Sequence, residues 1–441
     1  MNPAFERRQW LNAHWFQFFN AITFQIVMGA PIIVYAKSLG ASSTVLGIIA
    51  SFTPLLTVFQ LPAAQHLERY GYKRFVLAGW GTRTVFIFAL TLVPLMGFLD
   101  TASKMAAMMS ALFMINLIRG ISTAGWMPWI TSLVPQEVRG RYLSIDQCFM
   151  YAGCLVSLVA SAIVMTGHVD PWEYSLVFFI SASCGTISLF FIRRIPDVPP
   201  SETTRKSSQP VPWGAMLKYP PFRKLITFNL IFVVVTGSLG VFTVEFLREE
   251  SRLEVSTVLY LSAFSFVGAL VMLPFSGPWV DRVGSKPLFR VATLLFALPI
   301  AGWCLIAAGI LPSRMPIIAA LNFLTGAATA NFSLASARIT MATMPEMGRN
   351  HFFAMFYVIS NLGLGAAPVV WGVTLDMIGT FEAVTGVFHW KRHSIYFLAL
   401  LAINAIAFAY ISRLHEAPGA GRQEPSLIYA RLKRASRFWH R

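Results

Sequence analysis

Charged residues are scarce in this chain, and acidic residues are the scarcest of them. Only 12% of the 441 residues are charged, with 19 Asp and Glu against 35 Lys and Arg, whereas 56% are hydrophobic. An average soluble domain carries about twice that charged fraction, ~25%, so the composition excludes an ordinary water-soluble globule. We therefore expect an integral membrane protein.

Cysteine is also rare, and no residue cluster suggests catalysis. The four cysteines fall inside apolar runs, where they act as small hydrophobic side chains, and they show no disulfide framework. The eight histidines are scattered, without cysteine or acid at metal-ligand spacing, and no glycine-rich phosphate loop is present. The sequence therefore predicts no enzyme, no cofactor, no metal site and no direct use of ATP.

Long apolar runs make up most of the rest of the sequence. Roughly twelve of them reach the ~20 residues that a helix needs to cross a ~30 Å hydrocarbon core. The runs are continuously apolar, without the ~10-residue alternating segments of barrel strands, which favours helices.

A charged segment between apolar runs occurs twice. GPWVDRVGSKPL at 277–288 and AAQHLERYGYKRF at 63–75 are about 213 residues apart, and the same offset superposes STVL at 256–259 on STVL at 43–46. A second pair, PQEVRGRY at 135–142 and PEMGRNHF at 345–352, has an offset of about 210 residues. We interpret this as a duplication, and predict an all-α integral membrane fold of twelve transmembrane helices in two pseudo-symmetric six-helix bundles.

The composition changes between the two repeats. Residues 193–222 are rich in Pro, Ser, Thr and charge, and are predicted to be a cytoplasmic linker with a short surface helix at 213–218. The predicted halves are 1–192 and 223–412, and residues 413–441 form a basic cytoplasmic tail suited to anionic lipid.

The net charge of +16 reports topology rather than a nucleic-acid partner. When loops are assigned alternately to the two sides, about 24 Lys and Arg fall on the side of the amino terminus and about 7 on the other. This asymmetry predicts a multi-pass protein of the cytoplasmic (inner or plasma) membrane with both termini inside.

Polar residues recur inside the predicted spans at helical spacing. Asn116 and Arg119 share one face of the fourth span, and Asn322 and Thr325 share one face of the tenth. In the first span, at about 13–35, the sequence at 29–31 can bend the outer end. The candidate substrate and coupling residues are Gln25, Asn20, Asn116, Arg119, Glu245, Asn322, Thr325 and Asn361. The alternative for the amides and hydroxyls is helix packing through hydrogen bonds worth about 0.6 kcal/mol.

Arg119 stands out because a cation at the bilayer centre costs about 2.5–3.5 kcal/mol on insertion scales. It must face a wet cavity or a partner, and with no deep carboxylate in sight a carboxylate or phosphate of the substrate is a suitable partner. A structural ion pair is the alternative. Arg83, a few turns into the third span, is expected to extend towards the cytoplasmic surface. Glu245 is interpreted either as a protonation site or as a solvated residue at a helix mouth.

These features resemble the major facilitator superfamily of secondary transporters. That family carries G-x-L-A-D-R-x-G-R-K between its second and third helices and a weaker copy between the eighth and ninth. The later copy here has Gly277, Asp281, Arg282, Gly284 and Lys286 in place. The earlier copy keeps Glu68, Arg69, Gly71 and Lys73 but has Ala64 and His66 where the family has Gly and Leu.

The resemblance covers residues 12–412 and implies two halves that rock about a site at their interface. It implies a cytoplasmic gate of Glu68, Arg69, Gly71, Arg139, Asp146, Gly277, Asp281, Arg282, Gly284 and Arg349. Orientation signals and helix-end anchors are the alternative roles. The G-P-x-x-G-G run of common drug/proton antiporters is missing around Gly153, which disfavours that class.

The resemblance implies a monomeric secondary transporter in the lipid bilayer, moving a small organic solute by alternating access. We expect an organic anion or a sugar-like compound, carried by proton symport. Efflux of amphipathic compounds is one alternative, and a non-transporting membrane receptor or scaffold with the same fold is another.

Overall fold

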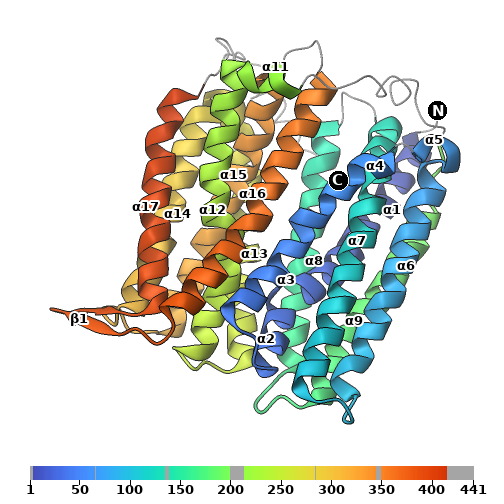
Figure 1. Cartoon of the computed structure of the whole chain (residues 1–441). Helices are drawn as coiled ribbons and strands as arrows, with labels where there is room; N and C mark the ends of the chain where they lie inside the picture. The colour runs from blue at the N-terminus through green and yellow to red at the C-terminus, as the bar shows by residue number, and fades with distance from the viewer. Residues whose placement is uncertain are drawn as a thin grey trace, which may run out of the picture.

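The computed structural model describes residues 3–64, 66–134, 139–198, 213–283, 285–343 and 349–414, which are predominantly helical (Figure 1). Within them, twelve helical spans are long and apolar enough to cross a membrane. The prediction of an all-α, multi-pass membrane protein with twelve transmembrane helices is confirmed.

The first half is built from eleven helical segments. Their bounds are α1 (Pro3–Met28), α2 (Ala30–Ser38), α3 (Ser43–Leu56), η1 (Thr57–Phe59), α4 (Gln60–Ala64), α5 (Leu67–Tyr70), α6 (Tyr72–Leu92), η2 (Val93–Leu95), α7 (Thr101–Leu133), α8 (Arg139–Val164) and α9 (Pro171–Arg193), of which the short α5 lies between the second and third spans.

The second six spans follow a short helix, α11 (Trp213–Lys218), which has the bounds that the sequence predicts. They are α12 (Pro220–Glu249), α13 (Val255–Val283), α14 (Ser285–Ala307), α15 (Met315–Thr343), α16 (Arg349–Ile378) and α17 (Arg392–Tyr410), followed by η4 (Ile411–Arg413). An antiparallel hairpin of β1 (Ala383–Thr385) and β2 (Phe388–Trp390) joins α16 to α17.

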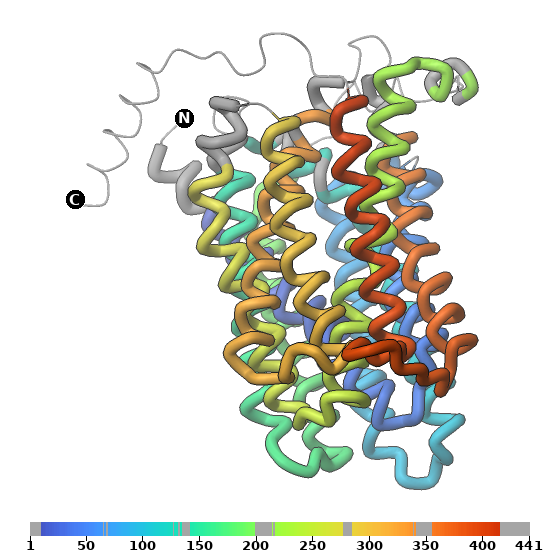
Figure 2. The backbone as a smooth tube through the Cα atoms, turned by 90° about the vertical axis from the view of Figure 1, so that its left-hand side faces the viewer, coloured from blue at the N-terminus to red at the C-terminus, as the bar shows by residue number. Residues whose placement is uncertain are grey.

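The two bundles lie side by side, and the view turned by 90° places the second bundle in front of the first (Figure 2). Figure 1 also distinguishes the two ends of the molecule. We call the end with α5 and α11 the α11 end, and the end with β1–β2 and the α2–α3 connection the hairpin end. These names are used below for position along the helices.

The first span is broken, as its glycine and proline predict. α1 ends at Met28, and α2 starts at Ala30 with Pro31 in its first turn. A Cβ at Gly29 would collide with the side chain and carbonyl of Gln25, so the break can only be made by glycine. The break places Gln25 and Gly29 on the wall of the central cavity described below.

Close packing of helices joins the two halves. α3 packs along α16, α8 packs along α13, and α2 contacts α12. Glycines permit the first of these contacts, because a Cβ at Gly47 would meet the Pro368 carbonyl and a Cβ at Gly372 would meet the Ser43 carbonyl. Small residues of this kind let helix backbones approach closely in membranes.

Candidate functional site

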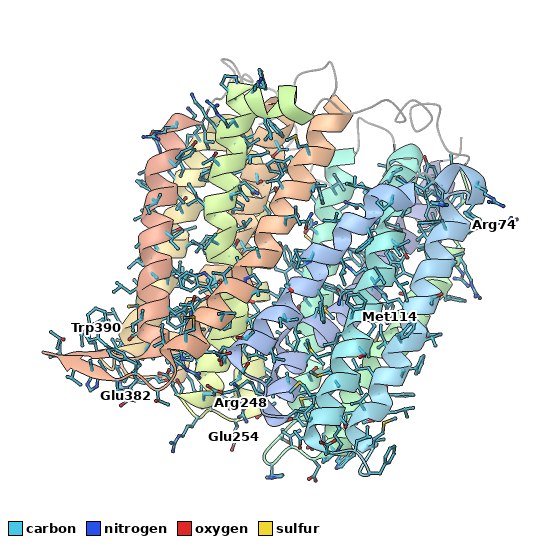
Figure 3. The ribbon with its side chains drawn as sticks, viewed as in Figure 1. Arg74, Met114, Arg248, Glu254, Glu382 and Trp390 are labelled. Atoms are coloured by element: carbon cyan, nitrogen blue, oxygen red, sulfur yellow. The ribbon has the colours of Figure 1, made fainter. Side chains whose placement is uncertain are left out.

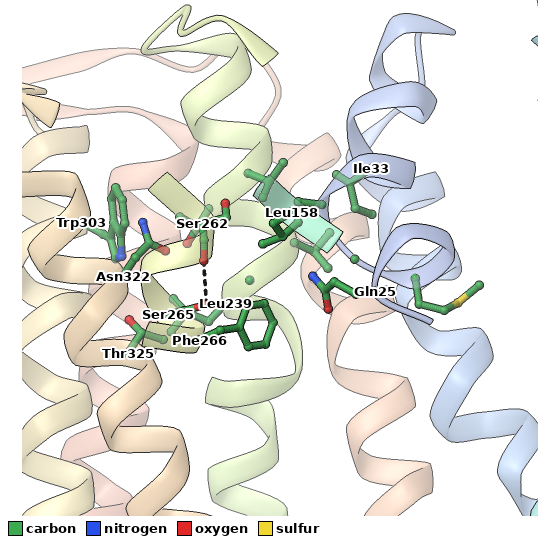
Figure 4. Close-up of a pocket in the computed structure, with 17 residues that line it drawn as sticks. Gln25, Ile33, Leu158, Leu239, Ser262, Ser265, Phe266, Trp303, Asn322 and Thr325 are labelled. Atoms are coloured by element: carbon green, nitrogen blue, oxygen red, sulfur yellow. Dashed lines mark hydrogen bonds between the residues drawn. The ribbon is translucent and has the colours of Figure 1, made fainter. Parts of the chain in front are cut away.

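A cavity of about 260 Å³ lies between the two bundles (Figure 4). The first half contributes Gln25, Met28 and Ile33 from α1 and α2, and Leu158 from α8. The second half contributes residues of α12, α13, α14 and α15, among them Leu239, Ser262, Ser265, Phe266, Trp303, Asn322 and Thr325. We call this space the central cavity.

Three of the sequence-predicted residues meet at this cavity. Figure 4 shows Gln25 on one side and Asn322 and Thr325 on the other. Asn322 donates to the Ile318 carbonyl and Thr325 to the Leu321 carbonyl, each one turn earlier in α15. Their remaining acceptor groups, together with the Gln25 amide, suit a small solute with hydroxyl or amine groups.

Arg119 lies in the middle of α7, half-buried, beside α1. Its guanidinium carbon is 4.6 Å from the centroid of the Phe24 ring, one turn from the cavity residue Met28 in the direction of the α11 end. No described residue forms an ion pair or a hydrogen bond with the guanidinium of Arg119. A deep cation therefore remains available to an anion.

Arg83 is a second deep cation, and its expected extension to the surface is wrong. Its side chain is buried in the first half, with 2% of the residue exposed. Its Nη2 donates to Asn20 Oδ1 at 2.8 Å, whereas its Nε is buried without a hydrogen-bond partner. Its partner Asn20 lies one turn of α1 from Phe24, the residue on which Arg119 packs. The Arg83 side chain can stay buried because its hydrogen bond to Asn20 replaces part of the hydration that it loses.

The other predicted amides do not line the central cavity. Asn20 accepts the hydrogen bond from Arg83. Asn116 is buried, accepts a hydrogen bond from Thr53 Oγ1 at 2.9 Å, and donates to Leu112 and to Met28 Sδ. Asn361 donates to the Tyr357 carbonyl of its own helix. In this conformation Asn20 and Asn116 make hydrogen bonds between helices, as in the alternative interpretation, whereas the bond of Asn361 lies within α16 and joins no second helix.

Glu245 lies at the hairpin end and is fully buried, which contradicts its interpretation as a solvated residue at a helix mouth. Ser43 of the first half donates to Glu245 Oε1 at 2.6 Å, and Lys37 Nζ lies 3.4 Å from the same oxygen. Lys37 also pairs with Glu249. The charges of α12 are therefore met by a cation and a hydroxyl from the opposite bundle.

The second half adds two basic residues from the start of α17. Arg392 pairs with Glu249 and lies 3.6 Å from Glu245 Oε1, and His393 Nδ1 contacts Glu250. His393 Nε2 is 3.9 Å from Glu245 Oε2, and both atoms are buried without a hydrogen-bond partner. We call Lys37, Ser43, Glu245, Glu249, Glu250, Arg392 and His393 the hairpin-end cluster.

Asp376 adds a second contact between the halves. Its two carboxylate oxygens accept from the backbone amides of Ser43 and Thr44 at 3.0 and 2.8 Å, at the first turn of α3. Every hydrogen bond and ion pair that joins two described residues across the halves lies at the hairpin end, from Lys37, Ser43 or Thr44 to Glu245, Glu249 or Asp376.

Most of the predicted gate lies outside the described part of the chain. This applies to Gly284, to the surroundings of Gly277, and to the side chains of Glu68, Arg139, Asp281, Arg282 and Arg349. Of the rest, Arg69 is exposed, and Gly71 has a φ of 73° at the α5–α6 turn, which explains glycine there. Asp146 is buried, with Oδ1 3.3 Å from His14 Nδ1 in the same half.

Sequence reasoning missed Lys37, Arg392 and His393, and it misplaced Arg83. The three missed residues lie near the ends of apolar runs, where a basic residue is commonly an orientation signal. The sequence feature that could have identified them is the scarcity of acidic residues: each basic residue near a helix end has few possible partners, and Glu245 is the main one. Within the described residues, no group of three His, Cys, Asp or Glu side chains is placed to hold a metal ion.

Comparison with known proteins identifies a family and several relatives of this chain. The family profile of the Major Facilitator Superfamily matches residues 14–269 and 241–439. The ectoine/proline transporter of Corynebacterium glutamicum is 22% identical over 358 residues, which span 74% of this chain and 68% of that protein. Sialin of Ovis aries is 23% identical over 358 residues, spanning 77% of this chain and 66% of sialin.

The fold also matches solved structures. A D-xylose-proton symporter superposes with a TM-score of 0.73 at 12% identity, covering 96% of this chain and all of that one. At this identity the likeness concerns the arrangement of the helices alone.

Proposed function

The chain belongs to the major facilitator superfamily and is a membrane transporter of a small solute rather than an enzyme; from this premise, we propose that it carries a small organic anion by alternating access, coupled to protons. The proposed solute has a carboxylate or phosphate and hydroxyl or amine groups. Its binding site is the central cavity together with Arg119.

The observation that carries this proposal is the pair of deep cations without an acidic partner among the described residues. Arg119 is half-buried over Phe24, and Arg83 binds Asn20, one turn away on the same helix. Two neighbouring cations away from water are costly unless an anion joins them. An arginine fork binds a carboxylate or phosphate with two parallel hydrogen bonds, which supplies both affinity and orientation.

The names of the relatives agree with such a solute. The Corynebacterium glutamicum relative is named for ectoine and proline, and proline carries a carboxylate. The polar wall of Gln25, Asn322 and Thr325 supports further groups beside the anion, as in a sugar-like acid. Since the two walls of the cavity belong to one chain, we propose a monomer as the transporting unit.

We propose Glu245 as the proton-coupling residue. In its ionised form it accepts from Ser43 and attracts Lys37 across the interface between the halves. Protonation removes this attraction, which favours opening of the hairpin end. The proton and the solute then act on the same equilibrium between two conformations.

The distribution of Lys and Arg supports placing the α11 end, with both termini, in the cytoplasm of a cell whose inner or plasma membrane holds the protein. In that orientation the structure is closed towards the outside. The predicted cytoplasmic gate would form in the opposite conformation.

Uptake into proteoliposomes tests the proposal. A panel of radiolabelled hydroxy acids, amino acids and sugar acids is offered with and without an inward proton gradient. We expect gradient-driven accumulation of at least one acid, its loss in Arg119→Gln, and partial retention in Arg119→Lys. Arg290→Gln, which removes an exposed cation of α14, is the matched control.

Three outcomes would contradict the proposal. Unchanged uptake of every accumulated acid by Arg119→Gln would exclude the anion anchor. Gradient-driven extrusion of amphipathic compounds alone would favour the efflux alternative. Saturable binding without flux would favour a receptor.

A further inference from the structure

A second cavity, of about 530 Å³, lies at the hairpin end and is distinct from the central one. The first half lines it with Tyr35, Lys104, His168 and Tyr174, and the second half lines it with Arg248, Arg252 and Glu254. Figure 3 shows Arg248 and Glu254 at this end of the molecule. We call it the hairpin-end cavity; it shares no lining residue with the central cavity.

The charges around the hairpin-end cavity are unbalanced. Lys104, Arg248 and Arg252 face one carboxylate, Glu254, and no described residue forms an ion pair with any of these three cations. Within the described part of the chain, Lys104 donates only to the Pro94 carbonyl, at 3.5 Å, and Arg248 donates to the Leu253 carbonyl. At the same end of the molecule, Lys37 and Arg392 are paired with acids. Three cations that form no ion pair with a described residue, Lys104, Arg248 and Arg252, therefore line this one cavity.

A buried hydroxyl points to the same conclusion. Tyr35 lines the cavity with 3% of its surface exposed, and its Oη is buried without a hydrogen-bond partner. A buried hydroxyl normally has a partner, because leaving water without one is unfavourable. The Tyr35 ring packs on Tyr174, another lining residue, with centroids 4.9 Å apart. An anionic oxygen in the cavity would satisfy this donor.

The backbone holds Arg252 in an unusual conformation beside the cavity. With a φ of 49°, it is the non-glycine residue with positive φ within the described chain. The amide of Leu253 donates to the Leu247 carbonyl, and Arg248 holds the Leu253 carbonyl, so the link between α12 and α13 is fixed from both sides. Glycine would suit this φ better, yet the position carries a cation.

We propose that the hairpin-end cavity binds an anion with a carboxylate or phosphate group, and that this anion bridges the two halves. Lys104 and the Tyr35 hydroxyl would hold it from the first half, and Arg248 and Arg252 from the second. Because the two sets separate when the hairpin end opens, the anion binds the closed conformation better and stabilises it. The site is regulatory and does not require the central cavity to bind the same compound.

Thermal unfolding of the purified protein in detergent tests the site. Inorganic phosphate is titrated against chloride at constant ionic strength, and the unfolding midpoint is recorded. We expect a saturable rise, because a ligand that binds only the folded state stabilises it. The rise should disappear in Arg252→Gln and Lys104→Gln. It should persist in Arg314→Gln, an exposed arginine at the same end but outside the cavity, and in Arg119→Gln.

Arg252→Gly is the control for a folding defect, because glycine adopts the positive φ readily while the charge is removed. It should fold at least as well as the wild type and still fail to respond to phosphate. A rise that persists in Arg252→Gly and Lys104→Gln would overturn the proposal.

Lipid nanodiscs without free phosphate separate the two sources of the anion. A higher midpoint with phosphatidylglycerol than with phosphatidylcholine, abolished by Arg252→Gly, assigns the site to a lipid headgroup. A response to phosphate in detergent, without this lipid effect, assigns it to a soluble anion. No response in either arm would overturn the proposal. The Arg119→Gln variant lacks the proposed solute anchor. If its unfolding midpoint still rises with the anion, the hairpin-end site is separate from the proposed transport function.

Discussion

Ser43 Oγ and Glu245 Oε1 are 2.6 Å apart, although the two residues are 202 positions apart in the chain and belong to different halves. Lys37 reaches the same carboxylate, so α12 holds both the end of the first span and the start of the second. The contact can exist only while the hairpin end is closed. In the alternating access that we propose, the strength of this contact enters directly into the balance between the two conformations.

Glu245→Gln should separate solute binding from proton coupling. The amide keeps the size of the side chain and can still accept from Ser43, but it no longer carries the charge that faces Lys37 and Arg392. We expect gradient-driven accumulation to disappear while exchange of labelled for unlabelled solute continues. Glu382→Gln, at an exposed ion pair with Lys391, is the control. Normal accumulation by Glu245→Gln would rule out its coupling role.

Gly372→Ala and Gly47→Ala should weaken closure of the hairpin end. The added methyl group meets a backbone carbonyl of the other half in each case, Ser43 or Pro368, and a backbone cannot rotate away as a side chain can. We expect the population to move towards the conformation open at the hairpin end. The measurement is labelling of a cysteine introduced at Ser43 or Thr44 in a cysteine-free background. Gly81→Ala, with open space around it, should label like the parent.

The wall of the central cavity can be tested against the sequence-based assignment. Asn322→Ala or Gln25→Ala removes one hydrogen-bonding group from the wall, and a net hydrogen bond is worth about 0.5–1.5 kcal/mol. We expect solute affinity to fall up to about tenfold, since ~1.4 kcal/mol is a factor of ten. Asn361→Ala supplies the comparison, because Asn361 bonds to its own helix. An equal loss in Asn361→Ala, measured by binding calorimetry, would favour the sequence-based assignment.

Asn20→Ala should destabilise the first half through Arg83. The substitution leaves a buried guanidinium without its described side-chain acceptor, and a lost hydrogen bond to a charged group costs about 1.5–3 kcal/mol. We expect a lower unfolding midpoint. The double variant Asn20→Ala with Arg83→Met should recover part of the loss, because it also removes the unpaired charge. Additive losses in the double variant would show that the two residues act independently.

The sequence predicted the helices better than the contacts between them. Apolar runs locate the twelve spans, because lipid leaves few alternatives to a helix. The break at Gly29 is also local, because it follows from the glycine itself and from the nearby Pro31, which cannot continue a helix. Arg119 was found because a charge in mid-span is conspicuous. The environment of Arg83 was not found, since only the fold brings Asn20 to it. For the same reason Lys37 was not connected to Glu245 across 208 positions.

The contact of Asp376 with α3 has a consequence for sequence change in relatives of this protein. The carboxylate is bound by the backbone amides of residues 43 and 44, and every amino acid except proline supplies such an amide. Mutation can therefore alter the Thr44 side chain while this attachment between the halves survives, whereas the Ser43 hydroxyl also binds Glu245. Diversity at position 44 and invariance of an acid at position 376 would be the evolutionary signature of this contact.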